Sequence, residues 1–414
     1  MRALTPGLSK KGGGRLVKEG EQNMLAPEGE FRFTRLENVQ YGPGKIMALG
    51  RELDRRGLKR ALIVTGKTLG ASPLMDRVKR ALDQRLAGVF SGIRQHVPHS
   101  TLVAAVEEAR RVNADCLVGF GGGSPIDAAK LVAMAILTGN AAAAPIDFGA
   151  RKTEAVGPEL PNFAIPTTLS AAEFTPGGGM TNEETRRKGG RFDERLQSKV
   201  VILDPALTLE TPDWLWASTG IKALDHALEC SYSTRSQMIC DTLAAKAIRI
   251  LRTHLLPSFK GPGHEQVAHR GMCQLGAWLS IFGMLNTRLG ISHALGHQIG
   301  ARWDVPHGVT SCITVPHVLR FMAQTAPQRF EAIAEGFEVK FDPANPGAAA
   351  MECAQRAAEF VRSLGVPTSL SEAGVPRSEL SEIIEPVLAE INGARSLDRP
   401  VTAQEMTALL EGAY

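Results

Sequence analysis

Aromatic residues are scarce in this chain of 414 residues, at 5% of the composition. So few rings leave little material for the stacking platforms that hold single-stranded nucleic acid. A surplus of one charge is also missing, since 47 basic residues are set against 43 acidic ones and the basic residues are scattered. No run of about 18 uncharged apolar residues occurs, and a membrane-spanning helix needs roughly that length. We therefore expect neither a nucleic-acid partner nor a membrane partner.

Paired-cysteine motifs are absent as well. The chain has six cysteines, and none of them forms a C-x-x-C motif. In a chain of this length, widely spaced cysteines are typical of reduced thiols in the cytosol. No secretory signal is recognisable, because lysines and glycines interrupt the first apolar stretch. The sequence therefore predicts a cytoplasmic protein.

The composition that remains is that of a globular enzyme, with 43% hydrophobic and 22% charged residues. Residues 1–30 are rich in Gly, Lys and Glu and lack periodicity, which predicts a disordered tail. Residues 31–205 alternate between strand-like and helical patterns, whereas residues 206–414 show helical periodicity alone. We therefore expect a tail, a nucleotide-binding domain and a helical domain that carries the metal and substrate sites, in that order.

The alternation in residues 31–205 predicts an α/β domain with a parallel sheet and helices on both faces. The predicted strands are residues 60–65, 115–120, 162–165 and 200–203, and the predicted helices are residues 74–86, 101–112 and 124–137. The glycine- and charge-rich residues 177–199 predict a hairpin or a loop. The all-α domain is predicted to contain helices at residues 218–229, 241–256, 265–282, 327–336, 348–364, 378–391 and 403–411.

A glycine-rich turn joins one predicted strand to the next helix. It reads GFGGGSPIDAAK, with Gly121, Gly122 and Gly123 ahead of Ser124. Glycines let the backbone turn sharply and approach a ligand, and a helix N-terminus offers unpaired N–H groups to an anion. We expect Ser124 to cap the helix and Asp127 to complete an acidic capping arrangement. The turn therefore predicts a phosphate site for a dinucleotide, although it follows neither G-x-G-x-x-G nor the P-loop pattern.

Two further strand ends are candidates for cofactor contacts. Gly66 and Lys67 follow the first predicted strand, where the ribose of a dinucleotide binds in such sheets. Because Gly66 lacks a carboxylate that would repel a 2′-phosphate and Lys67 adds a positive charge, we expect NADPH to be accepted. Thr167 and Thr168 follow the third predicted strand, and their hydroxyls could donate to a phosphate or a carboxamide. An exposed loop lysine and an ordinary strand terminator are the alternative interpretations.

Four histidines stand in a pattern typical of metal ligands. His293 and His297 are one helical turn apart in SHALGH, so they share a helix face. His226 lies in the helical segment GIKALDHALE, and His307 follows a turn in VPHG. Imidazoles collected from several segments bind divalent transition metals. Histidines satisfied in the core or exposed at the surface are the alternative.

Four motifs in this chain resemble the iron-containing (group III) alcohol dehydrogenase superfamily. They are GGGSPIDAAK, PTTLSAAEFTP, GIKALDHALE and SHALGHQIGARWDVPHG, and they occur in the order typical of that family. The resemblance implies NAD(P) and a catalytic Fe2+ or Zn2+ in a cleft between the two domains. It implies His226, His293 and His307 as metal ligands beside one aspartate, and His297 as a proton-relay or positioning group near the nicotinamide. It also implies a homodimer.

The aspartate position does not match, because Lys222 stands one helical turn before His226. At about 4 Å from a divalent ion, an ammonium would cost roughly 8 kcal/mol at an effective dielectric of 20. One interpretation is that Lys222 turns away or is neutral and that water completes a three-histidine metal site. The other is that the protein is metal-independent and that Lys222, with the histidines, polarises the substrate carbonyl. The maleylacetate reductase branch also departs at this position, which slightly favours the second interpretation.

The residues and the resemblance together predict an NAD(P)-dependent oxidoreductase. The expected reaction is hydride transfer between the nicotinamide and a small alcohol or carbonyl compound, with catalytic roles for Lys222 and His297. The first alternative is a maleylacetate reductase, which reduces an activated alkene. A remote alternative is a lyase related to dehydroquinate synthase, and a binding module that has lost its chemistry is a third.

Overall fold

The structure is a computed structural model that describes residues 29–139, 154–183 and 187–414. Contacts divide the chain into two compact units, Met1–Phe31 and Arg32–Tyr414, and all described helices and strands belong to the second. Nearly all of the predicted tail, residues 1–30, lies outside the described residues. Because the α/β and helical regions fall within one contact unit, a domain boundary near residue 205 stays a prediction.

A six-stranded parallel sheet forms the nucleotide-binding half. Its strand order is β1-β8-β5-β4-β2-β3. The strands are β1 (Asn38–Tyr41), β2 (Ala61–Gly66), β3 (Leu86–Ile93), β4 (Cys116–Gly121), β5 (Asn162–Pro166) and β8 (Val200–Leu203). The four predicted strands are the central ones, β2, β4, β5 and β8, and the sequence missed the two edge strands. The predicted helix at residues 74–86 ends at Leu82, and β3 begins at Leu86.

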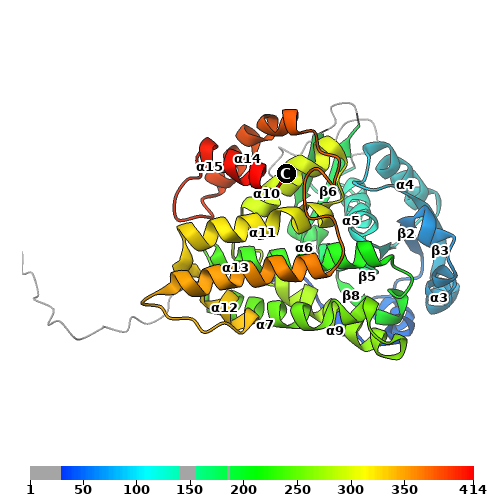
Figure 1. Cartoon of the computed structure of the whole chain (residues 1–414). Coiled ribbons are helices and arrows are strands. Elements are labelled where there is room, and N and C mark those ends of the chain that lie inside the picture. Colours follow the sequence, from blue (N-terminus) through cyan, green and yellow to red (C-terminus); the bar gives the residue numbers. More distant parts are fainter. Residues whose placement is uncertain (1–28, 140–153, 184–186) are drawn as a thin grey trace, which may run out of the picture. The chain divides into compact units, whose positions relative to one another are not determined.

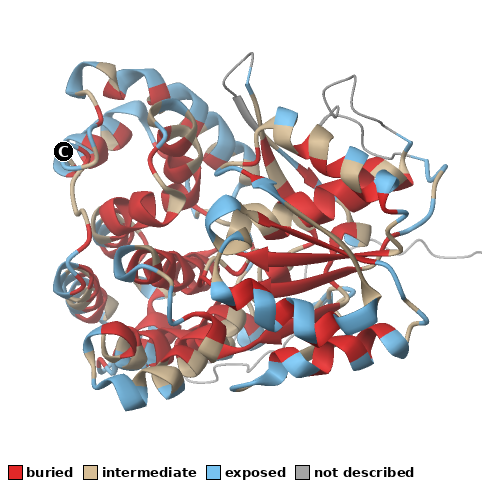
Figure 2. Cartoon of the chain, turned by 90° about the vertical axis from the view of Figure 1, so that its right-hand side faces the viewer, coloured by how far each residue is buried: buried red, intermediate tan, exposed pale blue. Residues whose placement is uncertain are grey.

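Helices cover both faces of this sheet, as predicted. On one face, α1 (Leu49–Asp54) and α3 (Pro73–Leu82) bury their apolar side chains against alternate residues of β2 and β4. On the other face, α4 (His99–Arg111) and α5 (Gly123–Leu137) pack against the intervening residues. Figure 2 shows the buried strands between these two layers. The chain changes face between β2 and β4, which creates the crevice where α/β sheets bind ligands.

Residues 177–192 form the predicted excursion from the sheet. Strands β6 (Gly177–Asn182) and β7 (Arg187–Phe192) pair antiparallel in a separate two-stranded sheet. The helices that follow residue 204 make up the second half, and Figure 1 shows them beside the sheet. They are η5 (Pro205–Leu207), α6 (Asp213–Tyr232), α7 (Met238–His254), α8 (Pro257–Lys260), α9 (Gly263–Ile281), α10 (Ile291–Trp303), α11 (His307–Thr325), η6 (Pro327–Arg329), α12 (Glu331–Phe337), α13 (Pro346–Ser363), η7 (Arg377–Ile383), α14 (Ile384–Ala394) and α15 (Ala403–Gly412).

Helix α6 lies at the centre of the helical half. Every residue from Trp216 to Tyr232 is buried, and α7, α9 and α11 all pack around the helix. A helix buried on all sides shows no amphipathic stripe, which is why the sequence predicted only part of it. Within the described residues, no helix combines the length and apolarity needed to cross a membrane.

Candidate active site

One cleft of about 1870 Å3 brings the predicted cofactor and catalytic residues together. It opens at the carboxyl ends of β2 and β4 and continues between the sheet and helices α6, α10, α11 and α14. Every predicted site residue except Gly121 lines it: Gly66, Lys67, Gly122, Gly123, Ser124, Asp127, Thr167, Thr168, Lys222, His226, His293, His297 and His307. The glycine turn and the imidazole cluster therefore face one shared space.

The glycine turn has the space and the polar groups that a diphosphate needs. Gly121 has a φ of 139°, which an L side chain rarely adopts. A Cβ on Gly122 would lie 3.3 Å from Thr168 Cγ2, and one on Gly123 would lie 3.2 Å from Ser170 Oγ. Within the described residues, the buried hydroxyls of Thr168 and Ser170 have no hydrogen-bond partner. With the N-terminus of α5 beside them, these groups fit the diphosphate of NAD(P).

The capping prediction for this turn was wrong. Gly122 is the N-cap residue of α5, and no side chain caps the helix. Ser124 Oγ instead accepts a hydrogen bond of 3.2 Å from the backbone N–H of His96. The Asp127 carboxylate accepts one of 3.1 Å from the N–H of Gly179 on β6. These side chains fasten neighbouring segments to the turn, so the first N–H groups of α5 stay available to a ligand.

Lys130 is a structural residue that the sequence reasoning missed. Its side chain is fully buried, and its Nζ lies 2.9 Å from Asp127. The same ammonium donates to the carbonyl oxygens of Ala172 and Thr175, at 2.9 and 3.2 Å, and to that of Gly177. It therefore ties α5 to the segment that leads into β6. A lysine within a predicted amphipathic helix gave no signal of this role.

At the other end of the glycine turn, β3 adds a basic residue to the predicted ribose site. Gly66 pairs with Ile93 of β3, and a Cβ on Gly66 would lie 3.3 Å from the Ile93 carbonyl oxygen. Arg94 follows directly and lines the cleft with Lys67. Its guanidinium donates to Glu183 at 2.7 Å. Because the sequence missed β3, it gave no reason to place Arg94 beside Lys67.

The four motif histidines gather at the opposite end of the cleft. The ring centroid of His293 lies 5.2 Å from that of His226 and 5.5 Å from that of His307. His226 and His293 are buried. Burial lowers the pKa of His226 well below its ordinary value, and the positive charge of Lys222 lowers it further. His226 is therefore neutral at pH 7.

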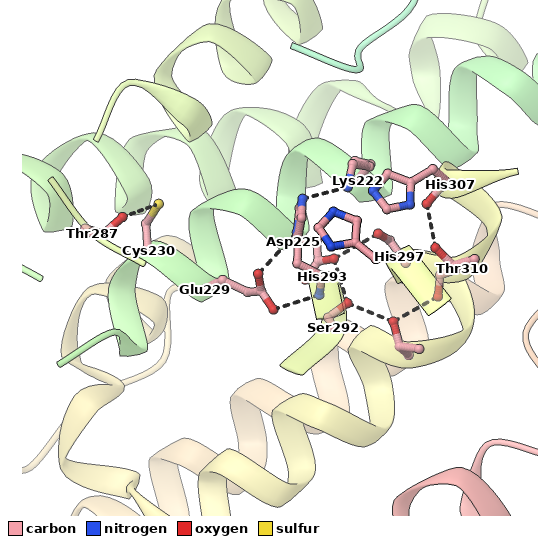
Figure 3. Close-up of polar contacts among 12 residues, drawn as sticks. Lys222, Asp225, Glu229, Cys230, Thr287, Ser292, His293, His297, His307 and Thr310 are labelled. Atoms are coloured by element: carbon pink, nitrogen blue, oxygen red, sulfur yellow. Dashed lines mark hydrogen bonds and ion pairs between the residues drawn. The ribbon is translucent and has the colours of Figure 1, made fainter. Parts of the chain in front are cut away.

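Lys222 is hydrogen-bonded within this cluster. Its Nζ lies 2.9 Å from Nε2 of His293, and Oε2 of Glu229 lies 3.2 Å from Nδ1 of the same ring. Figure 3 shows Lys222, His293 and Glu229 in this order. As an ammonium, Lys222 can only donate; Nε2 of His293 would then accept from it, and the ring proton would be on Nδ1, facing Glu229. The sequence reasoning missed Glu229, which lies two helical turns after Lys222 on α6.

Two buried carboxylates accompany Lys222 on α6. Asp225 accepts hydrogen bonds from the hydroxyls of Ser292 and Ser311, at 2.6 and 2.8 Å. Oε1 of Glu229 accepts from the hydroxyl of Tyr232 at 3.1 Å. Burial raises the pKa of both carboxyl groups above the ordinary range, and the nearby Lys222 opposes that rise. The ammonium is thus buried beside negative or proton-sharing groups, not beside apolar side chains.

The residues present do not fit a divalent metal ion. Imidazoles on a tetrahedral ion have ring centroids about 5 Å apart, since each metal–nitrogen bond is about 2 Å long, and the ring spacing here agrees with that. However, Nζ of Lys222 lies 2.9 Å from Nε2 of His293, so the lysine takes the place that a metal would need beside that nitrogen. No set of three His, Cys, Asp or Glu side chains in the described part of the chain has metal-binding geometry.

His297 lies one turn beyond His293 on α10 and is more open to solvent. Its Nδ1 is 2.9 Å from Oε1 of Glu390 on α14, and its ring stacks on that of His307 at a centroid distance of 5.6 Å. A carboxylate on Nδ1 orients the ring and leaves Nε2 for a substrate. Glu390 is far away in sequence, so only the fold identifies it. Arg302, on the same helix, is paired with Glu379 and Glu382.

The crossing of α6 and α11 fixes the position of His307. A Cβ on Gly308 would lie 2.7 Å from the backbone carbon of Ser218 and 2.9 Å from its oxygen. Since backbone atoms cannot rotate away, we expect Gly308→Ala to lower the free energy of unfolding by about 1–3 kcal/mol. Urea unfolding measures this loss of stability. Gly347→Ala in α13 is the matched control, because nothing lies within 4 Å of that Cβ. Equal stability changes for the two variants would contradict the close approach.

Two family matches together cover almost the whole second unit. Residues 37–205 match the family described as iron-containing alcohol dehydrogenase, and residues 216–414 match its C-terminal region. Lactaldehyde reductase from Escherichia coli K12 is 32% identical over 387 residues, which cover 91% of this chain and 98% of the relative. Maleylacetate reductase from Burkholderia cepacia is 30% identical over 382 residues, which cover 92% of this chain and 96% of the relative.

Solved structures show the same fold. A 1,3-propanediol oxidoreductase matches with a TM-score of 0.84 and 27% identity, over 93% of this chain and 100% of the other. The maleylacetate reductase from Agrobacterium tumefaciens matches with a TM-score of 0.75 and 25% identity, over 94% of this chain and 99% of the other. The family, the relatives and the shared cleft agree with one another. This chain therefore belongs to the iron-containing alcohol dehydrogenase family and is an oxidoreductase.

Proposed function

We propose that this protein uses NADPH to reduce a small, uncharged aldehyde or ketone to the alcohol. The observation that carries the proposal is that the glycine turn lines the same cleft as Lys222 and the four motif histidines, which we call the Lys222–histidine cluster (Lys222, His226, His293, His297 and His307). The relatives named above, which include a lactaldehyde reductase, support a reductase. They do not determine the substrate, because their identities are near 30%.

Each part of the cleft has a distinct task in this reaction. Bound NADPH would supply the hydride. The N-terminus of α5, with the hydroxyls of Thr168 and Ser170, would hold its diphosphate. The Lys222–histidine cluster would receive the substrate oxygen and stabilise the negative charge that develops there. His297, oriented by Glu390, would pass a proton to that oxygen through Nε2.

The charge at the substrate end favours an uncharged substrate. Glu379, Glu382 and Glu390 all line that part of the cleft, and Arg302 is already paired with the first two. A dianion such as maleylacetate would meet these carboxylates, and like charges repel. The similarity to maleylacetate reductases keeps that substrate as the second candidate.

An NADPH-oxidation assay tests the proposal. Short aldehydes and ketones, including lactaldehyde, are compared with maleylacetate at equal concentration. We expect turnover of the uncharged carbonyl compounds and a much lower kcat/KM for maleylacetate. A preference for maleylacetate would support the second candidate, and the absence of NADPH binding would overturn both.

Cofactor choice gives a separate prediction at Gly66. An aspartate there would place a carboxylate at the ribose end, beside Lys67 and Arg94. We expect Gly66→Asp to lower kcat/KM for NADPH about 10- to 100-fold, because a carboxylate repels the 2′-phosphate. The value for NADH should change little. The kcat/KM of the wild type and of Gly66→Asp is measured with NADPH and with NADH. A wild-type enzyme that strongly prefers NADH would contradict the expected use of NADPH.

A further inference from the structure

The disagreement between the metal expected in this family and the residues in this cleft supports a specific inference. We propose that the Lys222 ammonium, held by His293 and Glu229, takes the role of the divalent metal, so that the enzyme works without one. This rests on the proposed function, because it concerns the group that polarises the substrate carbonyl. It goes further by assigning that role to three named side chains.

The geometry around Lys222 fixes the ammonium at the centre of the cluster. Nζ lies 2.9 Å from Nε2 of His293, and the Glu229 carboxylate lies 3.2 Å behind Nδ1. In metal sites, a carboxylate behind a histidine orients the ring and makes it a better donor toward the ion. Here the Glu229 carboxylate faces Nδ1 at ion-pair distance, and a negative charge there makes His293 a better acceptor for an ammonium. Glu229 also accepts from the N–H of His293 and from Tyr232, so it cannot easily turn away.

The burial of Lys222 and the charged groups around it also support its role in place of a metal. Lys222 is 7% exposed, and the buried Asp225 and Glu229 follow it one and two turns later on α6. The cluster therefore contains Lys222 with two carboxyl groups on the protein side and the cleft on the other. A divalent ion added to this arrangement would meet the ammonium and would lose His293 as a ligand. A protonated lysine has no lone pair to offer a metal.

The ammonium can polarise the substrate carbonyl and stabilise the oxyanion, as the metal ion would. An ammonium has three N–H donors, so Lys222 can donate to a substrate carbonyl oxygen while it stays hydrogen-bonded to His293. As hydride adds to the carbonyl carbon, the C=O π electron pair moves onto that oxygen, and a proton from solvent reaches it through His297. The balance is R2C=O + NADPH + H+ giving R2CHOH + NADP+. Lys222 keeps its proton throughout and stabilises the oxyanion.

Restoring the aspartate tests the proposal with a readout other than activity. The wild type and Lys222→Asp are produced with iron and zinc supplemented, desalted, and analysed for metal by mass spectrometry. We expect the wild type to carry metal far below stoichiometry and K222D to retain about one equivalent, since the introduced carboxylate would join three histidines as a ligand. Added Zn2+ should raise the Tm of K222D and leave that of the wild type unchanged.

The double variant K222D/H293A is the matched control, and it should lose the metal that K222D gains. A wild type that retains one equivalent of iron or zinc, with turnover abolished on its removal, would overturn the proposal. So would a K222D that folds, by its melting curve, and gains no metal. NADPH binding is measured in the same samples. If the wild type failed to bind NADPH, the proposed function would fail while the metal result would still stand on its own.

Discussion

Substituting valine for Gly122 should abolish useful NADPH binding and leave the fold intact. A Cβ at this position would lie 3.3 Å from Thr168 Cγ2 and 3.4 Å from Oγ1, so valine methyl groups would fill the gap between the turn and the hydroxyl. We expect the Kd for NADPH to rise about 100-fold, equivalent to about 2.8 kcal/mol. Titration of NADPH fluorescence measures the change.

The backbone of Gly122 makes this substitution informative. Its φ of −79° is accessible to any residue, so the effect comes from lost space and not from backbone strain. Gly121 is a poorer choice, because its φ of 139° would strain the turn. Gly263→Val, at the first residue of α9 with nothing within 4 Å of its Cβ, is the control. Unchanged NADPH affinity in G122V would show that the diphosphate binds elsewhere.

The sequence predicted the central strands and missed the edge strands for a physical reason. Strands β2 and β4 are buried on both faces, so they appear as continuous apolar runs. Strand β3 lies at the edge of the sheet, and its residues before Ile93 are only partly buried or exposed. An edge strand of this kind has neither a continuous apolar run nor a clean alternation. Arg94 was missed as a direct consequence.

The parts of the candidate site that lie in one short sequence motif could be predicted from the sequence. The glycine turn and the histidines could be found because each residue type has few other uses in such a pattern. Glu229 and Glu390 could not be found, because a glutamate on a helix is ordinary and only the fold places it beside a histidine. Lys222 was recognised as a departure, but its contact with His293 depends on how α6 and α10 pack.

Removing the ammonium should affect chemistry far more than cofactor binding. We expect Lys222→Met to lower kcat about 10²- to 10³-fold, the effect typical of deleting one donor that stabilises a developing oxyanion. The Kd for NADPH should stay near the wild-type value, because Lys222 lies at the imidazole end of the cleft and the glycine turn at the other. The deuterium isotope effect with 4-deuterated NADPH should increase, since hydride transfer becomes slower relative to product release. Measurements in the presence of a chelator keep adventitious metal out of the three-histidine site that methionine would leave open.

The variant also tests whether Lys222 is simply structural. Without the cation, Asp225 and Glu229 remain buried on α6, and loss of one partner from a buried ion network costs stability. The raised pKa of both carboxyl groups lets them take up protons, which softens that cost. Kinetics must therefore be measured well below the Tm of the variant. Lys67→Met is the matched control within the same cleft, and it should raise the KM for NADPH with kcat nearly unchanged. If K222M kept its kcat while K67M lost it, the positive centre would lie at the ribose end and the assignment of Lys222 would be wrong.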